Sequence, residues 1–180
     1  MTSVVLFSVL VAAVGLERVA ELVVSRRNAA WSMARGGVET GRRHYRVMVV
    51  LHTGLLVCAL VEVWIRHPTL LPLLAASMFV LVLASQGLRW WCISTLGPRW
   101  NTRVIVVPGL PLVGSGPYRW LRHPNYVAVA VEGLALPLVH SAWITAAVFT
   151  VLNAVLLAVR IRVEDTALDA AAQRQREAAR

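Results

Sequence analysis

The chain has 180 residues, of which 58% are hydrophobic and 15% charged, and its mean hydropathy is +0.65. Soluble globular domains carry about 25% charged residues, so this composition excludes a disordered chain and argues against a soluble domain. All 18 basic residues are arginines and the net charge is +9, which fits a protein that faces an anionic membrane surface. The composition therefore predicts a small membrane protein with no nucleic-acid partner.

Three apolar stretches in the N-terminal half predict membrane-spanning helices. The first runs from about Val4 to Val24, and it lacks the positive n-region and the cleavage site of a signal peptide. The second, Val47–Ile65, and the third, Leu70–Leu88, are separated by the short break Arg66–Thr69. Each stretch approaches the length of about 20 residues with which a helix crosses a bilayer.

The C-terminal half contains a long loop and two further apolar stretches. The loop, Arg89–Asn125, is followed by Tyr126–Val139 and Ala142–Val159, and the polar tail Arg160–Arg180 predicts a helix. Because Tyr126–Val139 is shorter than a bilayer requires, we expect a span that is tilted or lies partly in a protein-lined cavity. The sequence thus predicts an all-α integral membrane protein with about five transmembrane helices.

The distribution of arginines predicts the orientation of these spans. Three regions hold 16 of the 18 arginines: Arg26, Arg27, Arg35, Arg42, Arg43 and Arg46; Arg89, Arg99, Arg103, Arg119 and Arg122; and Arg160, Arg162, Arg174, Arg176 and Arg180. Cytoplasmic segments of membrane proteins are enriched in arginine, so all three regions are predicted to be cytoplasmic. The N-terminus then lies outside and the C-terminus lies in the cytoplasm, and the long loops build a site that faces the cytosol.

The densest cluster of chemically capable residues is the run Gly114–Tyr126, before the fourth stretch. Pro124 suits the first position of a helix, which places His123 at the N-cap and leaves backbone N–H groups free to bind an anion. His123 adds an adjustable donor or acceptor, and Tyr126 adds an aromatic face with a hydroxyl. The alternative interpretation is an interfacial loop without chemistry, because Arg, Trp and Tyr gather at membrane surfaces.

A second cluster, Arg160–Asp165, begins where the fifth stretch ends. Arg160 and Glu164 are four residues apart and share one face of a helix. One interpretation is a surface ion pair worth roughly 0.3 kcal/mol. The other places this pair across a cavity from the turn Arg122–Tyr126, where it binds an anionic acceptor and a cationic or hydroxyl-rich ligand.

These motifs resemble a known family. The runs that carry the resemblance are Gly116-Pro117-Tyr118, Arg122-His123-Pro124-Asn125-Tyr126 and Arg160-x-x-x-Glu164-Asp165. They are similar to the isoprenylcysteine carboxyl methyltransferase family, whose members are membrane enzymes that use S-adenosylmethionine. Further runs resemble a bacterial branch that O-methylates alkylpyrones and alkylresorcinols: Glu17-Arg18-x-x-Glu21-Leu22, Ser25-Arg26-Arg27-Asn28, Gly36–Tyr45 and Arg99–Arg103.

The resemblance implies which residues bind the co-substrate. The family's cofactor contacts fall on Leu110, Pro111, Leu112, Val113, Tyr118, His123, Pro124, Asn125, Tyr126 and Glu164, and its substrate-side arginine falls on Arg160. By this resemblance one domain covers residues 1–180, with a three-span part at 1–98 and a cofactor-binding part at 99–180. The tail departs from the family pattern, since an aromatic, proline-containing segment usually follows the acidic pair and Asp169–Arg176 contains neither residue type.

Other ionisable residues lie within the apolar stretches. Glu17, Arg18 and Glu21 in the first stretch, and Glu62 and Glu132 in later ones, are costly at membrane depth and usually face a cavity or each other. We expect an internal ion network, with acceptor recognition as the alternative role. Glu132 follows Tyr126 by six residues and is a candidate to touch the site. No Cys/His spacing predicts a metal site.

The leading hypothesis is an S-adenosylmethionine-dependent O-methyltransferase of the bacterial cytoplasmic membrane. Its expected partners are membrane lipids and a lipophilic acceptor, which carries either a carboxylate or the hydroxyl of an alkylpyrone or alkylresorcinol. Arg160 is the predicted catalytic residue. The alternatives are a sterol-reductase-like membrane enzyme that uses NADPH and a non-catalytic protein whose arginines bind anionic lipids. The sequence does not define the oligomeric state.

Overall fold

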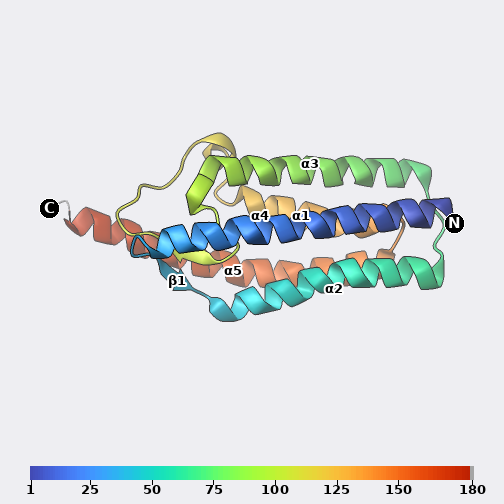
Figure 1. The fold of residues 1–180 in the computed structure, drawn as a ribbon, viewed down its shortest axis with the longest axis horizontal. Coiled ribbons are helices and arrows are strands. Elements are labelled where there is room, and N and C mark those ends of the chain that lie inside the picture. The colour runs from blue at the N-terminus through green and yellow to red at the C-terminus, as the bar shows by residue number, and fades with distance from the viewer. Residues whose placement is uncertain (179–180) are drawn as a thin grey trace.

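The computed structural model describes residues 1–178, in which five helices run side by side along the long axis (Figure 1). Their bounds are α1 Thr2–Met33, α2 Arg42–Arg66, α3 Pro72–Leu96, α4 Pro124–Leu138 and α5 Trp143–Ala178. Two short 3₁₀ turns, Gly97–Arg99 and Gly116–Arg119, lie in the long connection between α3 and α4. The predicted helical fold is confirmed, and the tail is helical as far as Ala178; Arg180, the end of the predicted tail, lies outside the described residues.

Four helices, α1, α2, α3 and α5, are long and apolar enough to cross a membrane. Large apolar side chains such as Leu16, Leu73 and Val151 are exposed on them, as expected for helices that face lipid. α4 matches the predicted fourth stretch but has 15 residues, which at 1.5 Å per residue is shorter than a hydrocarbon core of about 30 Å. The structure therefore has four candidate membrane-spanning helices and one shorter apolar helix.

The helices extend further than the apolar stretches that predicted them. α1 continues from the predicted end near Val24 to Met33, and α3 continues to Leu96. The prediction that Arg89 lies in the loop is wrong, because this residue lies inside α3 and is buried. Hydropathy marks where a helix meets lipid, but a helix continues into polar sequence when tertiary contacts satisfy the charges.

The apolar core fills the end of the bundle that holds the N-terminus and the α2–α3 and α4–α5 turns (Figure 1). Phe7 and Val11 of α1 pack there with Val63 of α2 and Leu136 of α4. α4 and α5 approach closely, since a Cβ added at Gly133 would lie 2.0 Å from the ring of Phe149. The residues that line the main cavity lie toward the other end of the bundle.

The opposite end carries a small antiparallel sheet that the sequence analysis did not predict. β1, Val38–Thr40, pairs with β2, Val104–Val106, with Glu39 opposite Ile105. The Glu39 carboxylate also forms ion pairs with Arg42, at 3.1 Å, and with Arg103, at 3.6 Å. The sheet joins the α1–α2 connection to the α3–α4 connection and so builds one wall of that end (Figure 1).

Two polar residues fix the ends of neighbouring elements. Asn28 of α1 donates to the carbonyl oxygens of Gly97, at 3.1 Å, and Trp100, at 2.8 Å, and so holds the start of the long connection. Glu62 is partly exposed, so the expectation that it is buried within its apolar stretch is wrong. Its carboxylate accepts hydrogen bonds from the Ile144 and Thr145 backbone N–H groups, where it satisfies amides in the first turn of α5.

Candidate active site

A cavity of about 680 Å³ extends from the sheet end of the bundle toward its middle. All five helices and the long α3–α4 connection contribute to its wall. The volume lies within the range of about 300–1,000 Å³ that is usual for small-molecule sites. Apolar side chains form most of the wall, and polar groups gather at two depths within it.

The predicted start of α4 is confirmed. His123 is the N-cap residue and Pro124 the first helical residue, and the Tyr126 N–H donates to the His123 carbonyl at 3.1 Å. His123 and Tyr126 stack with ring centroids 5.5 Å apart, and both line the cavity together with Asn125. Pro124 is fully buried and is not part of the cavity wall, so its contribution is to begin the helix.

The polar part of α5 covers this helix start. His123 Nε2 lies 3.0 Å from Asp165 Oδ1, and its Nδ1 lies 3.8 Å from Glu164 Oε1. Arg122 forms ion pairs with Asp165, at 3.0 Å, and with Asp169, at 3.1 Å. The predicted proximity of Glu164 to the Arg122–Tyr126 turn is therefore confirmed, and Asp165 lies beside the turn as well.

Arg160 is joined to Glu164 through a tyrosine and forms no direct ion pair with it in the described part of the chain. Arg160 Nε donates to the Tyr126 hydroxyl at 2.9 Å, and that hydroxyl donates to Glu164. The Arg160 guanidinium also donates to the Thr102 carbonyl, and the residue is only 5% exposed. The interpretation of Arg160 and Glu164 as a surface ion pair is therefore wrong.

The long connection brings the remaining predicted residues to the same cavity. Leu110, Pro111, Leu112 and Val113 line it, and Arg99 donates to the Pro111 carbonyl at 2.6 Å. Tyr118 lies on the wall beside them, and burial raises the pKa of its phenol well above its usual range. The hydroxyl therefore stays protonated at neutral pH.

Two cavity residues, Trp100 and Asn101, were not assigned a role from the sequence, whereas Asn125 was predicted to contact the cofactor. Trp100 Nε1, Asn101 Nδ2 and Asn125 Oδ1 are buried polar atoms with no hydrogen-bond partner among the described residues, and all three side chains line the cavity. Buried polar atoms are normally paired, so these atoms are free for a ligand that offers both donors and acceptors. Trp100 and Asn101 belong to the Arg99–Arg103 run that carries the family resemblance, which was the available signal.

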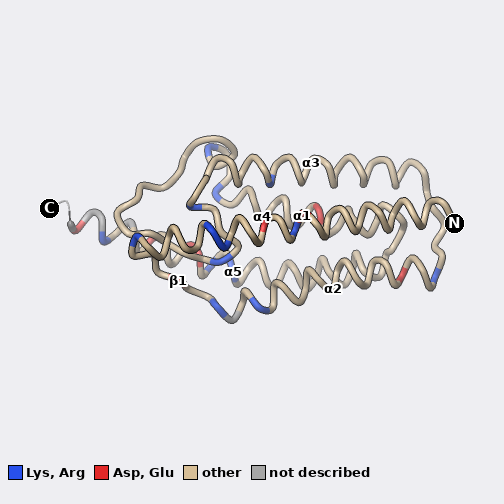
Figure 2. Tube along the Cα trace, in the orientation of Figure 1, with Lys and Arg blue, Asp and Glu red and all other residues tan. Residues whose placement is uncertain are grey.

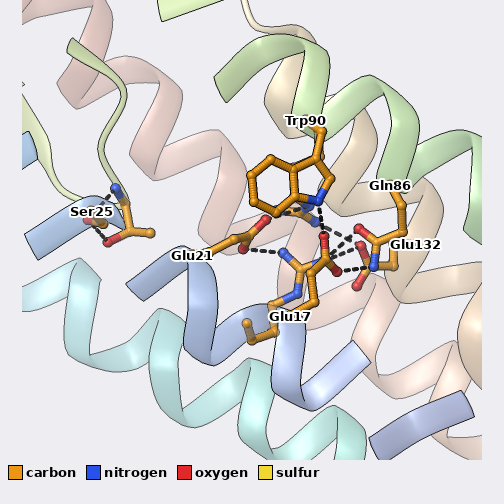
Figure 3. Close-up of polar contacts among 9 residues, drawn as sticks. Glu17, Glu21, Ser25, Gln86, Trp90 and Glu132 are labelled. Atoms are coloured by element: carbon orange, nitrogen blue, oxygen red, sulfur yellow. Dashed lines mark hydrogen bonds and ion pairs between the residues drawn. The ribbon is translucent and has the colours of Figure 1, made fainter. Parts of the chain in front are cut away.

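The predicted ion network is confirmed and lies deeper in the bundle (Figure 3). Arg18 pairs with Glu21, at 2.5 Å, and with Glu132, at 2.6 Å, and Arg89 donates to Glu132 at 2.9 Å. Glu17 accepts from Trp90 at 2.8 Å and from Gln86. Arg18, Glu21 and Arg89 line the cavity, whereas Glu132 is buried and outside its wall, so the suggestion that Glu132 touches the site is wrong.

The arrangement can bind ions of both signs. The α4 N-terminus with His123 suits an anion, and the Glu164 carboxylate suits an ammonium or a pair of hydroxyls. The aromatic faces of Tyr118 and Tyr126 suit a cation. No group of His, Cys, Asp and Glu side chains in the described part of the chain has the arrangement of a metal site.

The fold and the site define a helical membrane protein with a mixed polar and apolar small-molecule cavity. Residues 75–170 match the family model described as "Isoprenylcysteine carboxyl methyltransferase (ICMT) family", and the chain belongs to this family. Membership indicates a membrane methyltransferase. The matched segment includes α4, most of α5 and the long connection, which together carry most of the cavity's polar wall.

Two bacterial relatives extend the similarity to most of the chain. The protein YpbQ of Bacillus subtilis (strain 168), described as uncharacterized, is 39% identical over 165 residues, which cover 91% of this chain and 96% of the relative. An uncharacterized protein of Haemophilus influenzae is 25% identical over 148 residues, which cover 82% of this chain and 86% of the relative. No solved structure matches the chain.

Proposed function

We propose that the chain is an S-adenosylmethionine-dependent O-methyltransferase that methylates a lipophilic acceptor in the membrane. The observation that carries this proposal is the cavity that joins the α4 start, at His123–Tyr126, to Arg160 and Glu164 of α5. The family match, over residues 75–170, independently favours methyl transfer over the NADPH-dependent reductase that the motifs also allowed.

S-adenosylmethionine, when bound, supplies an electrophilic methyl group on a cationic sulfur, and the residues of the cavity fit it. The amides after Pro124 and the His123 side chain hold the amino-acid carboxylate. Glu164 accepts from the α-ammonium or the ribose hydroxyls, and the rings of Tyr118 and Tyr126 suit the sulfonium. Leu110–Val113 and the free Asn125 Oδ1 complete this part of the wall.

Arg160 orients the acceptor in this proposal. Its guanidinium is permanently charged, buried and held by Tyr126 and Thr102, so it presents a fixed positive charge to an acceptor oxygen. Alignment in a dry cavity is the main source of rate. A carboxylate or an enolic pyrone is ionised at neutral pH and needs little base catalysis, whereas a phenol, with a pKa of about 10, needs more.

The cavity opens toward the cytoplasm in this proposal, and the host membrane is the bacterial cytoplasmic membrane. Basic residues gather toward the sheet end of the bundle, and Arg66 lies in the last turn of α2 at the other end (Figure 2). Arginine enrichment on the cytoplasmic side supports an outside N-terminus and a cytoplasmic C-terminus. α4 then enters from the cytoplasmic side as the fifth, shorter crossing.

The test is a methyl-transfer assay on the purified full-length protein with labelled S-adenosylmethionine and a long-chain hydroxypyrone, resorcinol or carboxylate. We expect label in the extracted acceptor. Oxidation of NADPH with a sterol-like substrate, and no methyl transfer, would instead favour the reductase. Anionic-lipid binding that survives Arg122→Ala and His123→Ala, with no turnover of any acceptor, would favour the non-catalytic protein.

A further inference from the structure

The polar side chains of the cavity form two layers. The outer layer contains Tyr126, Arg160 and Glu164. A second layer, formed by polar residues on α1, α2, α3 and α5, lies deeper in the bundle. On α1, Ser25 lies 2.8 Å from the Thr102 hydroxyl, next to the Arg160 guanidinium, and Glu21 is four residues, or about 6 Å, further from the sheet end.

The other helices reach the same depth. On α2, the Met48 sulfur lies 3.1 Å from Arg160 Nη1, and His52 is one turn deeper. On α5, Asn153 is seven residues, or about 10 Å, deeper than Arg160. Glu21, His52, Arg89 and Asn153 all line the cavity, and we call these four residues the deep polar layer.

The Glu21 carboxylate and the Arg89 guanidinium of this layer are each held in place by a charged partner in the ion network. Arg18 binds Glu21 Oε2 at 2.5 Å, and Arg89 binds Glu132 at 2.9 Å, so neither charged group can turn away from the cavity without losing a buried partner. Figure 3 shows Glu21 and Glu132 converging from α1 and α4 on this network. Fixed groups of this kind recognise a ligand at little entropic cost.

The deep polar layer has unfilled hydrogen-bonding capacity. Glu21 is 3% and Asn153 is 2% exposed, and neither Glu21 Oε1 nor Asn153 Oδ1 has a hydrogen-bond partner among the described residues. Glu21 Oε1 lies 3.4 Å from Arg89 Nε as an ion pair without hydrogen-bond alignment. His52 Nδ1 lies 2.8 Å from the Met48 carbonyl, so in a neutral ring Nδ1 donates and Nε2 is the acceptor.

Among the described residues, the unpaired atoms of the layer are thus two acceptors, Glu21 Oε1 and Asn153 Oδ1, and one donor, Arg89 Nε, and together they suit a ligand group that both donates and accepts. A carboxylate, an ether or an alkyl chain has no donor, whereas a hydroxyl has one. Burying these acceptors against an apolar tail would leave them unpaired, which costs binding energy. The chemistry of the layer thus matches a hydroxyl and disfavours a purely hydrocarbon occupant.

We propose that the deep polar layer is a specificity subsite that binds a hydroxyl of the acceptor's head, separate from the oxygen that is methylated. This inference rests on the proposed function and narrows its substrate class. The acceptor is an amphipathic molecule whose head carries two oxygen functions, one aligned at Arg160 and one, a hydroxyl, bound by Glu21 and Asn153. A prenyl carboxylate whose head carries no hydroxyl is therefore a poor substrate.

The experiment compares two acceptors with the same alkyl chain, a 5-alkylresorcinol and a 3-alkylphenol, which differ by one hydroxyl. With saturating S-adenosylmethionine, the full-length wild-type protein should prefer the resorcinol in kcat/KM by about tenfold or more, as expected for a buried hydrogen bond to a charged group. Glu21→Gln and Asn153→Leu should each bring the ratio toward one by slowing the resorcinol reaction. Glu17→Gln alters the same ion network without lining the cavity and should keep the ratio.

Binding of both acceptors without the methyl donor, followed by tryptophan fluorescence, separates this inference from the proposed function. Tighter binding of the resorcinol that both variants abolish, without turnover, would reject methyl transfer and support the subsite. Equal binding by wild type, an unchanged ratio in both variants, or an equal loss with both acceptors would overturn the subsite. Asn153→Leu leaves every ion pair intact and decides the outcome if Glu21→Gln does not fold.

Discussion

Arg160 combines burial with three hydrogen bonds to groups that carry no full negative charge. Its guanidinium donates to the Tyr126 hydroxyl, the Thr102 carbonyl and the Met48 sulfur. A buried cation usually has a paired anion, so this charge is available to an anionic ligand in the cavity. The planar guanidinium also fixes the directions of its N–H donors, whereas the compact ammonium of lysine can rotate freely.

We therefore expect Arg160→Lys to lower kcat/KM for the acceptor by at least about tenfold, because alignment of the acceptor oxygen is lost. Affinity for S-adenosylmethionine should change little. Steady-state methyl transfer and calorimetry on the same preparation measure the two effects. Arg162→Lys, at an exposed position two residues away, is the control. Full activity of Arg160→Lys would reject the orienting role.

His123 and Glu164 belong to the part of the cavity assigned to the co-substrate. His123→Ala and Glu164→Ala should each weaken S-adenosylmethionine binding by about 1–3 kcal/mol, which is typical of a lost charge-assisted contact. Titration calorimetry gives the affinities. Asp169→Ala removes an exposed carboxylate whose one ion pair among the described residues is with Arg122, so this variant should bind normally. Wild-type affinity in both folded site variants would remove these residues from the site.

At the residue scale, the motifs predicted which side chains gather but not how they bond. Spacing placed Arg160 and Glu164 on one helix face, yet the tyrosine between them comes from α4. The partnerless Asn153 was also missed, although a lone amide within an apolar stretch was a usable signal. Sequence periodicity indicates the face of the helix on which a residue lies. The identity of its partner depends on tertiary packing.

At the scale of the element, α4 is held by its close contact with α5. An added Cβ at Gly133 would meet the buried ring of Phe149, whereas one at Gly54, also helical, would meet nothing within 4 Å. Both substitutions to alanine gain helix propensity, so the difference between them isolates the clash. We expect Gly133→Ala to be less stable than Gly54→Ala by about 1–3 kcal/mol. Unfolding in detergent followed by circular dichroism tests this, and equal stabilities would contradict the packing.

Element boundaries were predictable where local chemistry sets them. Pro124 and His123 marked the start of α4 correctly, because proline at the first helical position has a local cause. The sheet between Val38–Thr40 and Val104–Val106 was not predictable, since three residues are too few to show a period of two. The burial of Arg89 depends on Glu132, 43 residues away, which no local pattern reveals.

On the scale of the whole molecule, basic residues gather toward the sheet end of the bundle (Figure 2). Reporter fusions after Arg35, after Gly109 and at the C-terminus should report cytoplasm, and a fusion after Pro68 should report the outside. Paired fusions to alkaline phosphatase and a fluorescent protein provide the measurement. A periplasmic signal after Gly109 would contradict the cytosolic site, because this residue adjoins the Leu110–Val113 wall of the cavity.

The central claim is that the cavity beside α4 binds S-adenosylmethionine. Titration calorimetry of the purified full-length protein with S-adenosylmethionine tests it most directly, with NADPH as the comparison. We expect one saturable site for S-adenosylmethionine that His123→Ala and Glu164→Ala weaken and Asp169→Ala does not, and no binding of NADPH. Folded protein that binds NADPH, or that shows no S-adenosylmethionine binding, would contradict the account.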